Sequence, residues 1–187
     1  TFIETLYMEF KILEVKELDP QQRQQIAKLC FSAFDEDPWS QYLFMQTASH
    51  LVGILDGKIV SHALWTDRVF TINNSIKLKT AYVEYVTTDE RMQGKGLASQ
   101  LLRYLMDTLT LLGYELAALQ PEYDKFYKKL GWINWLGDLY IHQGKSTYLT
   151  DENKIMLYPL NIQLKDLLVH SKEHDVICTN WREGELW

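Results

Sequence analysis

The sequence contains few cysteines and no long apolar run, and each shortage excludes a class of protein. Two cysteines in 187 residues, Cys30 and Cys178, do not make the disulfide framework of a small secreted domain, so both are predicted to be buried, reduced thiols. No apolar run approaches the length of a membrane span, and no signal peptide is recognisable. We therefore expect a cytoplasmic protein without a membrane partner.

Positive charge is also scarce, with 19 Lys and Arg against 25 Asp and Glu, which gives a formal net charge of −6. A nucleic-acid partner is not expected, because such proteins carry a basic surface. An acidic surface suits a small cationic amine, although mild acidity is also a common means of staying soluble. No repeat, low-complexity segment or linker divides residues 1–187, so one domain is expected. The oligomeric state stays open, with a homodimer among the options.

Two glycines between a predicted strand and a predicted helix organise the chain. Alternation rich in Val, Tyr and Thr predicts a strand over residues 77–87. The helix that follows is predicted from leucines at helical spacing, Leu97, Leu101, Leu105, Leu109 and Leu112. Gly94 and Gly96 would let backbone N–H groups at its start close on a bulky anion. An ordinary turn explains the two glycines equally well, but neither a P-loop nor a dinucleotide motif fits.

The remaining elements point to a mixed sheet covered by helices. Asp19-Pro20 predicts the start of a helix that ends at Phe34, and tight turns at 56–57 and 73–74 predict a meander of three strands. Further strands are expected at 114–119, 132–142, 155–160 and from 176, with a helix at 122–131 and a polar loop at 144–154. No element is assigned to residues 165–175.

A second motif, Phe126-Tyr127-Lys128-Lys129-Leu130-Gly131-Trp132, follows the glycines. Together with Arg91-x-x-Gly94-x-Gly96, it resembles the GNAT superfamily of N-acetyltransferases. The resemblance implies a mostly antiparallel mixed sheet, splayed where acetyl-CoA binds, and makes Tyr127 a general acid for the leaving thiolate; a core tyrosine is the alternative. It implies a cofactor site made of Val86, Thr87, Thr88, Arg91, Gln93, Gly94, Lys95, Gly96, Leu97 and Ala98.

Three segments narrow the resemblance to aminoglycoside 2'-N-acetyltransferases. They are Tyr82-Val83-Glu84 with Val86, the Gly-Trp-x-x-Trp-x-Gly run of 131–137, and the tail of 178–187. The resemblance implies transfer of acetyl to an aminoglycoside amine, with the 2'-amino group as the expected acceptor and antibiotic resistance as a role that the sequence leaves open. It places the acceptor on Asp37, Glu84, Tyr85, Gln120, Asp151, Glu185 and Trp187. Tyr85 stands where that family has glycine, so the floor of the acceptor site is expected to be bulkier.

The chemistry can also be argued from the residues themselves. An amine must lose a proton before it attacks a thioester, and Glu84 at a strand end could take that proton through water. A backbone N–H beside Val86 could stabilise the oxyanion. A purely structural Glu84, another small amine as acceptor, and a catalytically silent acyl-CoA-binding module remain alternatives. His170 and His174 are four residues apart, but no metal site is expected from their polar surroundings.

Two acidic segments beside tryptophans are further candidates for the acceptor site. Asp35-Glu36-Asp37 precedes Trp39 and could hold an amine, although a solvated helix end explains it as well. Trp187 would bring an indole and an α-carboxylate together in the tail, next to Glu185. We expect this tail to dock as an acidic wall near Glu84 and Asp151.

Overall fold

The computed structural model describes residues 6–41, 43–150, 154–184 and 187. The chain forms two compact units, Thr1–Thr66 with Glu84–Leu105 and Asp67–Val83 with Met106–Trp187. Each unit has a core of its own, and the expectation of one domain stays a prediction. In the described part of the chain, no helix combines the length and the apolar character that crossing a membrane requires.

The first unit pairs its strands in the order of the sequence. Its elements are β1 (Glu9–Glu14), η1 (Val15–Glu17), α1 (Pro20–Phe34), α2 (Pro38–Gln41), η2 (Leu43–Gln46), β2 (Ser49–Leu55), η3 (Glu90–Met92) and parts of β3 (Lys58–Ile72), β4 (Ile76–Thr88) and α3 (Leu97–Leu111). β1 runs antiparallel to β2, and β2 antiparallel to β3. The turn between β2 and β3 has φ of +50° at Asp56 and +75° at Gly57, as a two-residue hairpin requires. The predicted hairpin is confirmed.

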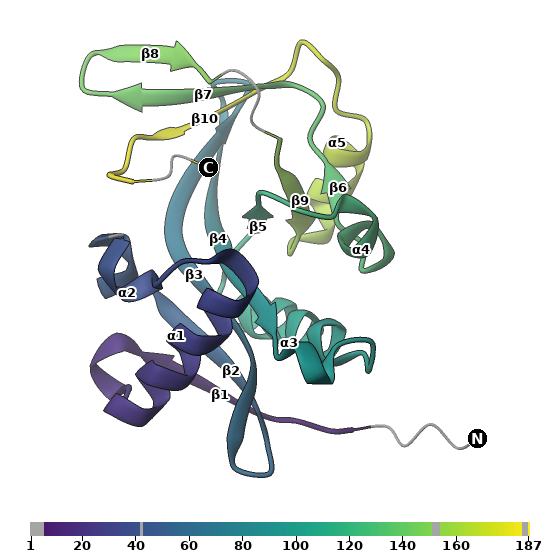
Figure 1. The fold of residues 1–187 in the computed structure, drawn as a ribbon. Coiled ribbons are helices and arrows are strands. Elements are labelled where there is room, and N and C mark those ends of the chain that lie inside the picture. Colours follow the sequence, from purple (N-terminus) through teal and green to yellow (C-terminus); the bar gives the residue numbers. More distant parts are fainter. Residues whose placement is uncertain (1–5, 42, 151–153, 185–186) are drawn as a thin grey trace. The chain divides into compact units, whose positions relative to one another are not determined.

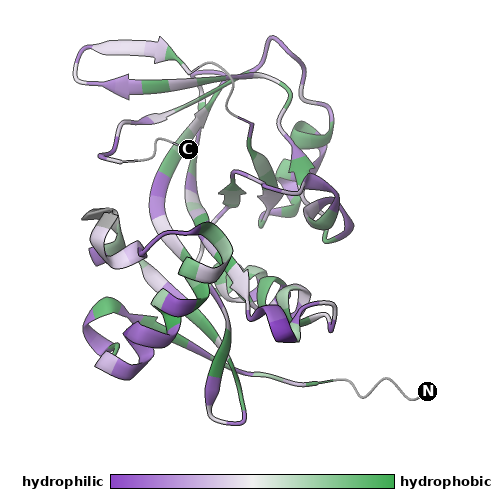
Figure 2. Ribbon diagram, viewed as in Figure 1, coloured by the Kyte–Doolittle hydropathy of each residue, from purple (hydrophilic) through white to green (hydrophobic). Residues whose placement is uncertain are grey.

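α1 covers the strands of the first unit (Figure 1). Asp19 caps it by accepting a hydrogen bond from the Gln22 N–H at 2.7 Å, while the Gln22 side chain accepts one from the Asp19 N–H. Its apolar stripe, visible in Figure 2, buries Ile26, Leu29 and Cys30 against Val52 and Ile59. Burial of each aliphatic side chain contributes about 2 kcal/mol, so this stripe fixes α1 on the sheet. The helix predicted from Asp19-Pro20 to Phe34 is confirmed.

The second unit contains the rest of the mixed sheet, in the order β6-β9-β5-β4-β3-β10-β7-β8. Its further elements are β5 (Leu116–Leu119), α4 (Asp124–Lys129), β6 (Ile133–Asn134), β7 (Asp138–Gln143), β8 (Ser146–Leu149), β9 (Met156–Pro159), η4 (Ile162–Leu164), α5 (Lys165–Val169) and β10 (Val176–Asn180). β4 pairs parallel with β5 and β10 parallel with β7, whereas the other pairings of this unit with a described register are antiparallel. The predicted fold class, a mixed sheet flanked by helices, is confirmed.

The strand predicted over residues 132–142 is wrong, because the chain changes partners in the middle of it. β6 pairs with β9, and after a break β7 pairs with β10. Gly137 lies in the break, and a Cβ there would stand 1.9 Å from the Asp175 carbonyl oxygen. Only glycine allows this close approach, which lets the Asp138 N–H donate to the same oxygen at 2.9 Å.

Three smaller expectations are also corrected. The polar segment 144–154 contains β8, whose four residues are all exposed, so no buried apolar alternation marked it. Leu112 lies beyond the end of α3 and is 51% exposed, not part of its buried face. Residues 165–169, left unassigned, form α5.

Candidate functional site

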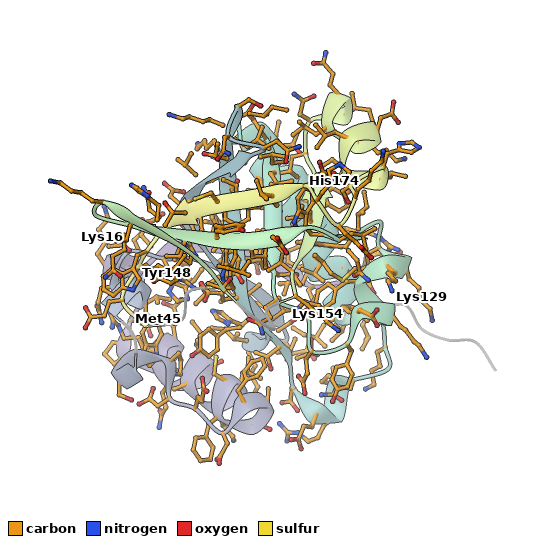
Figure 3. The ribbon with its side chains drawn as sticks, turned by 90° about the horizontal axis from the view of Figure 1, so that it is seen from above. Lys16, Met45, Lys129, Tyr148, Lys154 and His174 are labelled. Atoms are coloured by element: carbon orange, nitrogen blue, oxygen red, sulfur yellow. The ribbon has the colours of Figure 1, made fainter. Side chains whose placement is uncertain are left out.

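The last residues of β4 contain a left-handed residue. Tyr85 has φ of +52°, a conformation that costs a non-glycine residue about 1–2 kcal/mol. Glycine adopts this conformation without steric cost, which is consistent with the glycine that the resemblance leads one to expect at this position. The Tyr85 ring packs edge-on against Phe34, with centroids 5.5 Å apart, and contacts the cluster of Met45, labelled in Figure 3, and Leu64. These contacts offset the strain.

Two acidic side chains of the α1–α2 segment are already engaged in local hydrogen bonds. Tyr85 donates its hydroxyl to Glu36 Oε2 at 2.9 Å. Asp37 Oδ1 accepts from the Trp39 N–H at 3.0 Å, so this carboxylate caps the start of α2. Asp37 is exposed and Glu36 half-buried. Glu36, which the resemblance did not single out, is thus tied to the strand end that also carries Glu84.

Two buried histidines lie behind Tyr85. His62 Nδ1 lies 3.2 Å from the Tyr85 carbonyl oxygen, and His62 Nε2 lies 3.0 Å from His50 Nδ1. Burial, together with the neighbouring His50, holds the pKa of His62 well below its usual range. Burial first and the charge of Arg23 second lower the pKa of His50 to about 4, against an opposing contribution from the Met45 backbone. Both rings are therefore neutral at physiological pH.

A buried thiol completes this polar group. Cys30 Sγ lies 4.0 Å from His62 Nδ1. Burial, and then the carboxylates of Asp37 and Glu36, raise the pKa of Cys30 to about 12. Neither cysteine forms a disulfide, as predicted, although Cys178 is only half-buried. Cys30 is thus no activated nucleophile.

The threonines that follow Tyr85 differ in what they can offer a ligand. Thr87 is buried, and its hydroxyl donates to the Leu29 carbonyl oxygen at 3.3 Å. The Thr88 hydroxyl lies 3.0 Å from Ser61 Oγ, which donates to the Thr87 carbonyl oxygen at 2.9 Å. The register of β5 on β4 covers only residues 80–82 among the described residues, so the end of β4 extends beyond that pairing. Thr87 can therefore contribute to a ligand site only through its backbone.

The loop that follows β4 is held by an ion pair. Arg91 contacts Asp89 at 2.7 Å and is 82% exposed, and this pairing raises the pKa of Arg91 and lowers that of Asp89. Gln93 Nε2 donates to the Thr88 carbonyl oxygen at 3.4 Å. Arg91 is thus already neutralised within the loop. Its predicted contact with the cofactor would require this exposed ion pair to be shared.

Gly94 and Gly96 shape the entrance of α3. Their φ angles are +75° and +79°, and a Cβ at either would meet no atom within 4 Å. The first helical bond runs from the Gln100 N–H to the Gly96 carbonyl oxygen, so the N–H groups of the first turn, including Leu97 and Ala98, have no acceptor within the helix. Open space, free donors and the helix dipole together fit a bulky anion.

Replacing Gly96 by valine is expected to raise the acetyl-CoA KM at least tenfold, because φ of +79° is strained for a branched side chain that also enters the anion space. Steady-state kinetics measure this, with circular dichroism to show that the fold survives. Gly57→Val is the matched control, since Gly57 has φ of +75° and equally open surroundings in a hairpin turn. A KM that stays unchanged in Gly96→Val would show that the loop does not bind the pyrophosphate.

Tyr127 lies in α4 of the second unit, among aromatic rings. Its ring packs edge-on against Phe126 and Trp132, with centroids 5.1 and 5.8 Å away. Burial, and then the charge of Glu122, raise the pKa of Tyr127 to about 12. The phenol therefore stays protonated throughout the physiological range, which is the state that a proton donor needs.

The tail of the second unit is docked through its last tryptophan. Trp187 is buried, donates its indole N–H to Thr150 Oγ1 at 2.9 Å and packs edge-on against Phe70. Arg68 lies over its ring, 5.8 Å from the centroid. The expected docking of this residue is confirmed, whereas its proximity to Glu84 stays a prediction. Asp151 and Glu185 lie outside the described residues, and Gln120 is exposed just after β5.

The structure groups the sequence-predicted residues by unit. Most of them lie in the first unit, around the end of β4 and the start of α3, whereas Gln120, Tyr127 and Trp187 lie in the second. Sequence reasoning missed His50 and His62, because their hydrogen bonds join residues on three different strands. Apolar neighbours around each histidine were the only signal, and they are equally typical of a core position.

Comparisons with known proteins agree with this fold. The family model described as Acetyltransferase (GNAT) domain matches residues 11–134. No curated protein matches the sequence. Among solved structures, the GNAT family N-acetyltransferase YhbS from Escherichia coli, in complex with CoA, is similar with a TM-score of 0.62 and 17% identity, over 95% of this chain and 91% of that one.

Two further structures show the same likeness. ElaA from Escherichia coli has a TM-score of 0.58 and 18% identity, over 80% of this chain and 97% of that one. An acyl-CoA N-acyltransferase from Pseudomonas aeruginosa has a TM-score of 0.56 and 14% identity, over 80% and 98%. At these identities the likeness concerns the fold alone.

Proposed function

Because this chain belongs to the GNAT acetyltransferase family, we propose that it transfers acetyl from acetyl-CoA to the amine of a small cationic acceptor. One observation carries the proposal: the left-handed end of β4 and the open glycine loop at the start of α3 occur within the same unit. The first offers backbone groups to an extended ligand, and the second offers a place for its phosphates.

Acetyl-CoA would supply the activated acetyl group as a thioester. The N–H groups from Gln93 to Ala98 would bind its pyrophosphate, and the backbone of Val86 and Thr88 would hold the pantetheine arm as an added strand. The open space above Gly94 and Gly96 is consistent with this assignment. Lys95 would add positive charge at the rim, and Arg91 would do so by sharing its ion pair with Asp89.

Three groups of this chain would share the chemistry. Glu84 takes a proton from the acceptor amine, directly or through water. The Val86 N–H stabilises the negative charge that develops on the acetyl oxygen. Tyr127 donates its hydroxyl proton toward the departing sulfur, and its raised pKa keeps that proton in place until then. The transfer is direct, so no covalent enzyme intermediate is required.

For the acceptor, we propose an aminoglycoside-type antibiotic, with the 2'-amine as the reacting group. The similar tail and strand segments support this choice, and so does a tail tryptophan that is docked and not frayed. The net charge of −6 also suits a polycation. Binding should then weaken with salt, since exposed charge pairs are screened over about 8–10 Å at physiological ionic strength.

The test is a steady-state assay of CoA release with matched acceptors. Aminoglycosides with a 2'-amine are compared with those carrying a 2'-hydroxyl, and with polyamines, amino sugars and peptides. Turnover confined to the first group, with acetyl found on the 2'-nitrogen by NMR, would support the proposal. Turnover of another class would identify a different amine, and CoA binding without any turnover would favour a silent acyl-CoA-binding module.

Removing residues 185–187 should raise the acceptor KM at least tenfold while the acetyl-CoA KM changes little, because the tail carries the proposed acidic contacts of the acceptor. Both constants are measured in the same assay. Trp181→Ala is the control, since Trp181 is a tail tryptophan that is 43% exposed. If both constants change equally, or neither does, the tail only packs the second unit and the aminoglycoside proposal loses its main support.

A further inference from the structure

The two buried histidines form a hydrogen-bonded chain that has a direction. The Tyr85 carbonyl oxygen can only accept, so a hydrogen bond across the 3.2 Å contact assigns the hydrogen to His62 Nδ1, and the Cys30 thiol 4.0 Å from that nitrogen is then a weaker neighbour. A neutral ring has one N–H, hence His62 Nε2 accepts and His50 Nδ1 donates to it. In the reverse direction His50 Nε2 would donate instead, and the Met45 backbone, which opposes the lowering of the His50 pKa, is the group that would favour it. That atom meets no acceptor at hydrogen-bond geometry among the described residues, so we take the first direction.

This chain fixes the orientation of one peptide group. In a trans peptide the C=O and the following N–H point in opposite directions, and the described residues contain no cis peptide. The carbonyl of Tyr85 points at the fully buried ring of His62. The Val86 N–H must therefore point the other way, away from the histidine pair.

We propose that His62, supported by His50, is a positioning residue that holds the Tyr85–Val86 peptide so that the Val86 N–H faces the reacting acetyl oxygen. The inference rests on the proposed function and deepens it, because it names what orients the donor for the oxyanion. Neither histidine touches a substrate. Their effect passes through one backbone carbonyl.

The surroundings of the pair suit this role. Both rings have a relative exposure of 0%, and Trp39 packs against His50 with ring centroids 5.2 Å apart. A hydrogen bond in such a place is stronger than one in water, and it opposes relaxation of the strained Tyr85. An oxyanion donor is effective only when it is oriented before the reaction, so a rigid, uncharged support behind it is what the chemistry needs.

Substitutions at His62 separate positioning from packing. His62→Leu removes the donor to Tyr85, whereas His62→Asn places an amide N–H close to where Nδ1 stood. We expect His62→Leu to lower kcat about tenfold to a hundredfold with little change in the acetyl-CoA KM, and His62→Asn to restore most of kcat. His142→Leu is the control, because that histidine is exposed and its ring bonds only to Thr147 among the partners described for it.

A fold defect must not be mistaken for a positioning effect. If His62→Leu fails to fold, His62→Gln takes its place, since the longer side chain carries its amide past the Nδ1 position. Asparagine near the wild-type kcat and glutamine well below it would support the proposal. Equal kcat in folded Leu, Asn and Gln variants would overturn it.

A measurement that needs no turnover distinguishes this inference from the proposed function. Nitrogen-15 NMR of the histidine rings at pH 7 reports which ring nitrogen carries the hydrogen. We expect Nδ1–H at both His62 and His50, and an Nε2–H tautomer at His62 would overturn the proposal. A wild-type protein with both expected tautomers but no turnover on any amine would refute the proposed function while leaving the hydrogen-bond chain established.

Discussion

Replacing Glu84 by glutamine is expected to lower kcat/KM by about a hundredfold to ten-thousandfold, the range that loss of a general base produces. Glutamine keeps the size of the side chain but cannot take a proton from the acceptor amine. The residual rate should rise with pH, because solvent then supplies more of the deprotonated amine. The measurement is a pH profile of kcat/KM for wild type and variant, with acetyl-CoA saturating.

Glu9→Gln provides the matched control, since Glu9 is an exposed glutamate of the same unit that pairs with Lys11 at 3.1 Å. Its profile should coincide with that of the wild type. A Glu84→Gln variant with unchanged kcat/KM would assign Glu84 a structural role and leave amine deprotonation to the solvent. The kcat/KM of Glu84→Asp should lie between those of the wild type and Glu84→Gln, because the carboxylate is retained but withdrawn by one methylene.

Replacing Tyr127 by phenylalanine is expected to lower kcat by about tenfold to a thousandfold with a modest change in KM, since only the hydroxyl is lost. The phenylalanine ring keeps the edge-on contacts with Phe126 and Trp132, so the fold should survive. With a pKa of about 12, Tyr127 should produce no loss of wild-type kcat on its own account below about pH 11. Steady-state and single-turnover rates measure the loss of kcat and the change in KM, and a pH profile of wild-type kcat tests the titration of Tyr127.

Tyr123→Phe is the control for this substitution, because Tyr123 lies just before α4 and is 69% exposed. It should leave kcat unchanged. If Tyr127→Phe also leaves kcat unchanged, the thiolate departs unassisted or takes its proton from water.

The parts of the fold that the sequence predicted are those with local signals. Asp19-Pro20 carries its own cap, and the Asp56-Gly57 pair carries its own turn, so both could be placed without tertiary contacts. The entrance of α3 was found in the same way, because two glycines before a leucine-rich helix mark a left-handed loop. The signal for each of these features is contained within a few consecutive residues.

The parts that were missed depend on contacts between distant residues. Gly137 breaks a strand because of the Asp175 carbonyl, thirty-eight residues later, and nothing in the run 132–142 shows that partner. Likewise, the role of His50 and His62 depends on their contact with Tyr85. The sequence shows Tyr85 only as a residue that differs from the expected glycine and does not reveal its left-handed conformation. Hydrogen bonds of this kind leave no periodic pattern.

The buried thiol of Cys30 can report how often α1 opens away from the strands of the first unit. At neutral pH a thiol with a pKa of about 12 is almost entirely protonated, and its side chain is fully covered by the packing of α1 on the strands. A disulfide reagent can reach it only when α1 opens. The rate at which Cys30 is labelled in the folded protein therefore reports the free energy of that opening, and its change on adding CoA would reveal whether ligand binding tightens the first unit.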